Sequence, residues 1–88
     1  VVLQGNGPTF CAGADLAWMR RMRDYDEAQN LADAVAAADM FFALAELPMP
    51  VVARVHGAAL GGGAGLLAVS DLVVAADDGQ FGFTEARL

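Results

Sequence analysis

The chain has 88 residues, of which 57% are hydrophobic, and its formal net charge is −6. This composition is too apolar for a disordered segment, and a chain of this length can form at most one small domain. The negative charge and the lack of lysine argue against nucleic-acid binding, because a phosphate backbone requires a basic surface. No uncharged apolar run reaches the ~18 residues of a membrane span, so no membrane association is expected.

The first half of the chain is predicted to hold one strand and two helices. Residues 1–3 are a short apolar run typical of a buried strand. A loop of small residues over 9–14 leads to Asp15, a good N-cap for a helix that continues to about residue 23. Residues 27–47 show helical, amphipathic spacing, and Pro48 ends this second helix. Its apolar stripe consists of Leu31, Val35, Ala38, Phe42 and Ala45.

The second half alternates short strands with small-residue segments. A strand is predicted over 51–55, a loop over 57–63, a short helix over 64–70, a strand over 72–76 and an extended segment over 80–83. This order predicts an α/β fold with parallel crossovers. Because the chain begins within a strand rather than with Met, we expect an internal segment of a longer protein.

A glycine triplet, Gly61-Gly62-Gly63, stands between a predicted strand and a predicted helix. Such a loop exposes unpaired backbone N–H groups at a helix start, which suits an anion or a developing oxyanion. A phosphate-binding P-loop is excluded because it requires a lysine. A dinucleotide-binding loop is disfavoured because the preceding strand ends near Val55, well before the glycines. A loop that is rich in glycine only for close packing remains an alternative.

Two further features can contribute to the same chemistry. Ala12-Gly13-Ala14-Asp15 is a second small-residue turn that opens a helix, and an oxyanion hole usually needs two backbone donors. Glu85 follows Phe81 and Phe83 in an apolar stretch. Burial tends to raise the pKa of a carboxyl group, which suits a general acid or base. The alternative for Glu85 is a solvated glutamate in the first turn of a helix.

Five segments together resemble the enoyl-CoA hydratase/isomerase (crotonase) family, in family order and at family spacing. They are residues 10–16, 50–57, 59–63, 70–72 and 81–85. The resemblance implies a crotonase-like α/β fold in which ββα units stack into a spiral. Residues 1–88 would form part of its catalytic core, and helices beyond them would complete a homotrimer or hexamer.

The resemblance also implies the functional residues. The thioester carbonyl of an acyl-CoA would be held by the N–H groups of Ala14 and Gly62, and Glu85 would carry the proton chemistry. Coenzyme A would be part of the substrate, so no separate cofactor and no metal are implied. The substrate-binding positions would be Ala12, Ala14, Asp15, Leu16, Ala17 and Gly62.

Two positions depart from the family's pattern. Family hydratases commonly carry one glutamate two residues after the glycine triplet and another twenty residues further on. The first position is Gly65 here and the second is Glu85, so one of the two usual acids is missing. Many members also have a basic residue for the CoA phosphates where this chain has Ala17.

The leading function implied is a hydratase, a lyase that adds water to a 2-enoyl-CoA thioester. The alternatives are an enoyl-CoA isomerase that uses a single glutamate, and a non-catalytic member that binds acyl-CoA. Residues 61–67 with Gly65, and residues 83–88, are most similar to bacterial methylglutaconyl-CoA hydratases of leucine degradation, and residues 16–22 share this similarity. That similarity implies a branched, carboxylated substrate and a cytoplasmic protein, and the 88-residue segment alone would be inactive.

Three other polar or reactive residues are interpreted as structural. Cys11 lies in the first small-residue loop without an evident base, and a small buried hydrophobe is the simpler interpretation. His56 ends a strand and is interpreted as a packing or loop residue. Asp71 is predicted to anchor the turn that follows the short helix.

Overall fold

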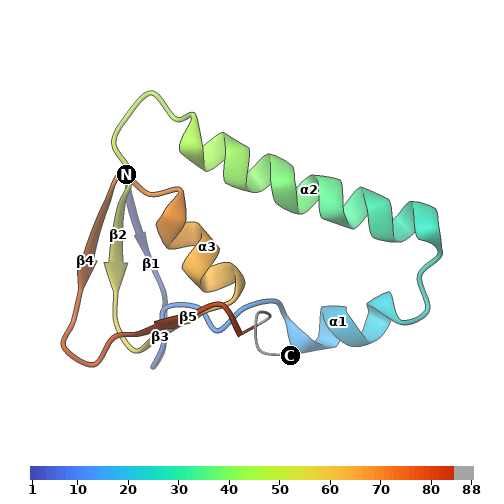
Figure 1. Cartoon of the computed structure of the whole chain (residues 1–88), viewed down its shortest axis with the longest axis horizontal. Coiled ribbons are helices and arrows are strands. Elements are labelled where there is room, and N and C mark those ends of the chain that lie inside the picture. Colours follow the sequence, from blue (N-terminus) through green and yellow to red (C-terminus); the bar gives the residue numbers. More distant parts are fainter. Residues whose placement is uncertain (85–88) are drawn as a thin grey trace.

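The computed structural model describes residues 1–84, and Figure 1 shows how their elements are arranged. The chain forms an α/β arrangement with two small parallel sheets, as the order of the predicted elements indicated. In chain order the elements are β1 (Val2–Gln4), α1 (Leu16–Met22), α2 (Glu27–Ala45), β2 (Val52–Val55), β3 (Ala58–Leu60), α3 (Gly62–Ala68), β4 (Leu72–Ala75) and β5 (Gln80–Gly82).

The larger sheet has the strand order β1-β2-β4, and both pairings are parallel. Along β2, Ala53 and Val55 are buried while Arg54 between them is exposed, which is the alternation of a strand with one covered face. Asp71 holds the start of this sheet, because its carboxylate accepts a hydrogen bond of 2.7 Å from the Val51 N–H. The predicted anchoring role of Asp71 is therefore confirmed.

The smaller sheet pairs β3 with β5, also in parallel. The prediction of a loop over 57–63 is wrong for β3, and α3 begins at Gly62 instead of residue 64. The three residues between Gly57 and Gly61 are too few to show the alternation of apolar and polar residues that identifies a strand. The segments that pair with them, β5 and Cys11, are distant in the sequence. The extended segment predicted near the end of the chain is confirmed as β5.

Helices α1 and α2 begin at well-formed caps. The Asp15 carboxylate accepts from the Trp18 N–H at 2.9 Å, as the predicted N-cap should. Asp26 and Gln29 form a reciprocal capping box at the start of α2. The indole N–H of Trp18 donates to the Asp33 carboxylate at 2.9 Å and thereby ties α1 to α2.

The apolar stripe predicted for α2 is not covered by the described part of the chain. Leu31 is 65% exposed and Phe42 is 64% exposed, whereas Phe41 and Leu44 are the half-buried apolar residues of this helix. The helix is confirmed, but within residues 1–84 its apolar stripe is mostly exposed. Figure 1 shows the reason: α2 extends well past the sheet, and only its C-terminal part lies near α3.

The core joins the first loop to both sheets. Phe10 is buried together with Ala53, Val55 and Ala59, and Cys11 packs against this cluster. The interpretation of Cys11 as a small buried hydrophobe is confirmed in part, because Cys11 packs against the core but is only half-buried. Within residues 1–84, no helix is both long and apolar enough to cross a membrane.

Candidate functional site

The loop before α1 runs beside β3 as a short parallel partner. The Cys11 N–H donates to the Ala58 carbonyl at 3.0 Å, and the Leu60 N–H donates to the Cys11 carbonyl at 2.9 Å. Because the two segments run in the same direction, both leave the small sheet at the same edge. One then enters the turn of Ala12 to Asp15 and α1, and the other enters the glycine triplet and α3. The structure thus brings the two small-residue turns together.

The glycine triplet divides into packing positions and one open position. A Cβ on Gly63 would overlap the Cys11 carbonyl oxygen, so a glycine is required for the close approach of the two loops. Gly61 has a φ of 57°, in the region that favours glycine. In contrast, within residues 1–84 a Cβ built on Gly62 meets no atom within 4 Å apart from its chain neighbours and the backbone of its own helix, and Gly62 is exposed. The packing explanation therefore accounts for Gly61 and Gly63 but leaves Gly62 facing open space.

The predicted backbone donors are unoccupied within the described part of the chain. Gly62 is the first residue of α3, where an N–H has no partner inside the helix. Ala14 lies directly before the N-cap Asp15. Across residues 1–84, neither the Ala14 N–H nor the Gly62 N–H donates a hydrogen bond to the protein. Both groups are available to an acceptor that enters from solvent.

The remaining predicted substrate-binding positions lie on the first turn and the start of α1. Ala12 and Ala17 are exposed, and Leu16 is 68% exposed. The Asp15 carboxylate is engaged by the Trp18 N–H and serves the helix start. These positions present mainly small or apolar surface, which suits the body of a thioester better than its phosphates.

The predicted acid, Glu85, lies outside the described residues. The chain that leads toward it is described as far as Thr84. The Gly61 N–H donates to the Gly82 carbonyl at 2.9 Å, so β5 ends directly beside the glycine triplet. The third segment of the predicted site therefore approaches the same sheet edge as the two turns.

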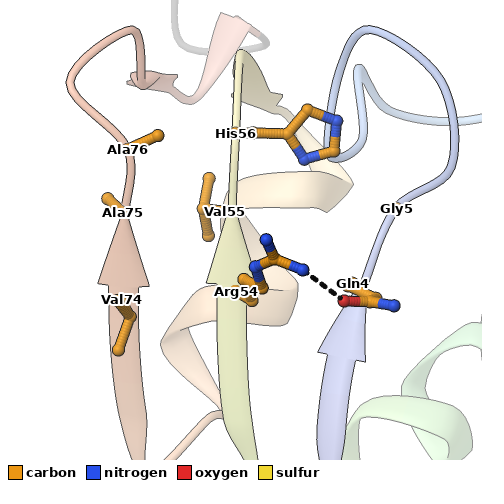
Figure 2. Close-up of a pocket in the computed structure, with 8 residues that line it drawn as sticks. All are labelled: Gln4, Gly5, Arg54, Val55, His56, Val74, Ala75 and Ala76. Carbon is orange, nitrogen blue, oxygen red and sulfur yellow. Dashed lines mark hydrogen bonds between the residues drawn. The ribbon is translucent and has the colours of Figure 1, made fainter.

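A separate hollow of about 470 Å³ lies at the carboxyl ends of the three strands of the larger sheet (Figure 2). The Arg54 guanidinium at its wall donates to the Gln4 side-chain oxygen at 3.3 Å. His56 is held by the Gly7 carbonyl oxygen, 2.6 Å from its Nε2. This contact confirms the interpretation of His56 as a loop-packing residue. None of the predicted site residues lines this hollow, and residues 1–84 contain no cluster of side chains suited to a metal ion.

Sequence reasoning missed one residue beside the predicted site. Phe41 of α2 lies against Gly65, and a Cβ on Gly65 would be 3.2 Å from two carbons of its ring. Gly65 is the position at which family hydratases commonly carry a glutamate. Helical periodicity alone places Phe41 on α2 but does not reveal which residue of α3 it faces, so the sequence held no signal for this pair.

The close packing of the two loops leads to a first prediction. Gly63→Ala should lower the free energy of unfolding of the full-length protein by roughly 3 kcal/mol, because the new methyl group overlaps the Cys11 carbonyl oxygen. Gly62→Ala is the matched control, since the same methyl group there meets open space. Urea unfolding of both variants measures the difference. Equal stabilities would show that the two loops are not in contact.

Comparisons with known proteins show the family to which the chain belongs. A family model described as "Enoyl-CoA hydratase/isomerase" matches residues 1–88. The enoyl-CoA isomerase/hydratase fer4 of Mycosarcoma maydis is 38% identical over 89 residues, which cover 100% of this chain and 31% of that protein. A crystal structure of an enoyl-CoA hydratase from Shewanella pealeana superposes with a TM-score of 0.86 at 44% identity, covering 91% of this chain and 30% of that one.

A third relative carries a different activity in its name. It is the (7aS)-7a-methyl-1,5-dioxo-2,3,5,6,7,7a-hexahydro-1H-indene-carboxyl-CoA hydrolase of Mycobacterium tuberculosis, 38% identical over 87 residues. The match covers 99% of this chain and 34% of the hydrolase. The chain spans about a third of the length of the curated relatives it matches. With all of its residues matched by the family model, the chain belongs to the enoyl-CoA hydratase/isomerase (crotonase) family.

Proposed function

We propose that the full-length protein is an enoyl-CoA hydratase that adds water across the Cα=Cβ bond of a 2-enoyl-CoA thioester. The observation that carries the proposal is the pair of small-residue turns at one edge of the small sheet. Each turn holds an N–H group that makes no hydrogen bond within residues 1–84. Two such donors can hold one thioester carbonyl oxygen.

The two donors would act on the charge that forms during the addition. When oxygen attacks Cβ, electron density moves through Cα to the thioester oxygen and creates an enolate. The Ala14 and Gly62 N–H groups would stabilise that oxygen, and one such donor is worth about 3 kcal/mol in comparable acyl chemistry. The negative charge then returns to Cα as a proton is delivered there.

Glu85 would carry both proton transfers. Its carboxylate would take a proton from water as the hydroxyl adds to Cβ, and the resulting acid would return a proton to Cα. No second carboxylate comes from position 65, because that residue is glycine. A single acid suffices when water adds across one face of the double bond. A methylglutaconyl thioester is one candidate substrate, and a homotrimer or hexamer is the proposed assembly.

A second candidate is an enoyl-CoA isomerase, and Gly65 is the observation that favours it. One carboxylate that moves a proton between Cα and Cγ needs no second acid and no water. The relative from Mycosarcoma maydis is named for both activities. A third candidate, a member that only binds acyl-CoA, would show binding without any turnover.

Reaction of the full-length protein with 2-enoyl-CoA and 3-enoyl-CoA in oxygen-18 water tests these candidates. For a hydratase we expect one labelled oxygen on a 3-hydroxyacyl product formed from the 2-enoyl thioester. An isomerase interconverts the two enoyl thioesters and incorporates no label. Absence of label with every 2-enoyl-CoA, including a methylglutaconyl thioester, would refute the hydratase proposal.

A further inference from the structure

The face of α3 that begins at Gly62 leads directly to Phe41. Gly62, Gly65 and Val69 are spaced by three and four residues, so they lie in one row along the helix. The space above Gly62 is open, and the space above Gly65 is bordered by the Phe41 ring. An acyl chain whose carbonyl is held at Gly62 and which follows this row would meet the ring after one helical turn.

An apolar hollow lies beyond the ring. It has a volume of about 350 Å³ and is lined by the C-terminal part of α2 and by Val69, the residue that follows α3. Phe41 lines it together with Ala38, Phe42, Ala45 and Val69, and none of these side chains is polar. The Phe41 ring therefore lines an apolar hollow and also borders Gly65, which lies one helical turn from Gly62.

We propose that Phe41 determines acyl-chain length in this protein by closing the path from Gly62 to the hollow. This inference rests on the proposed function only in assuming that the acyl group is held at Gly62. The ring also takes the room that a side chain at position 65 would need. Phe41 and Gly65 thus act as a steric pair. The Phe41 ring closes the end of the acyl pocket, and the absence of a side chain at Gly65 leaves space for that ring.

Binding of unreactive saturated thioesters tests the length limit without any need for turnover. In the full-length protein, Phe41→Ala should improve the affinity for octanoyl-CoA relative to butanoyl-CoA by about tenfold, because several methylene groups gain room. Met40→Ala is the matched control: Met40 precedes Phe41 on α2, is 43% exposed and does not line the hollow. It should leave the ratio of the two affinities unchanged.

A double-mutant cycle tests the steric pair independently. The change in melting temperature caused by Gly65→Ala should be about 3 °C more favourable in the Phe41→Ala background than in the wild-type background. The reason is that the new methyl group no longer meets the Phe41 ring. The Met40→Ala background should show no such difference.

The outcomes separate this inference from the proposed function. An unchanged ratio of octanoyl-CoA to butanoyl-CoA affinity in Phe41→Ala, or additive melting temperatures in the cycle, would overturn the role of Phe41 even in an active hydratase. A changed ratio in a protein that turns over no enoyl-CoA would support Phe41 and overturn the hydratase proposal. Absence of acyl-CoA binding would overturn both.

Discussion

Glu85→Gln in the full-length protein should reduce kcat for 2-enoyl-CoA hydration by about a thousandfold, because the change removes the group proposed to exchange protons with water and Cα. The amide has nearly the same shape as the carboxyl group, so the dissociation constant for the acyl-CoA should change little. A loss confined to kcat identifies an interaction made in the transition state. Steady-state kinetics together with equilibrium binding of a saturated acyl-CoA measure both quantities.

Glu46→Gln provides the matched control for this experiment. Glu46 is an exposed residue at the C-terminal end of α2, and its side chain forms no hydrogen bond or ion pair within residues 1–84. The same loss of a carboxylate there should leave kcat and binding unchanged. If Glu85→Gln retains near-complete activity, another group carries the proton transfer and the single-acid mechanism is wrong.

Local signals allowed the elements around the site to be predicted from the sequence. Asp15 predicted the start of α1 because the carboxylate of an aspartate at the N-cap accepts hydrogen bonds from the first N–H groups of the helix. The mostly apolar run before His56 predicted β2. Strand β3 was not predicted because it is only three residues long and pairs with Cys11 and β5, which are distant in the sequence. Non-local pairing leaves no periodic signature in so short a segment.

The candidate site could be predicted only in part from the sequence, because it also depends on non-local pairing. The order and spacing of the motifs pointed to the Ala14 and Gly62 turns, but their meeting at one sheet edge depends on the pairing of Cys11 with β3. The contact between Phe41 and Gly65 depends on how α2 is rotated against α3. Periodicity gives the spacing of apolar residues along a helix. It does not show which residues of another element pack against that helix.

The Gly62 N–H can be removed with little disturbance of the helix, which makes its proposed role testable. Gly62 is the first residue of α3, where proline is well tolerated because the N–H has no intrahelical partner. The preceding residue, Gly61, has a ψ of −121° and is therefore outside the α region that a following proline disfavours. Gly62→Pro should thus delete one donor and leave α3 in place.

Gly62→Ala is the reference for this change, because it keeps the N–H and its methyl group meets no non-neighbouring atom within 4 Å in the described part of the chain. We expect kcat of Gly62→Pro to lie at least a hundredfold below that of Gly62→Ala, roughly the effect of one oxyanion donor in acyl transfer. Both variants should unfold at similar temperatures, which a thermal melt checks. Equal kcat values in two folded variants would mean that the enolate oxygen does not bind at Gly62, and the proposed oxyanion hole would have to be placed elsewhere.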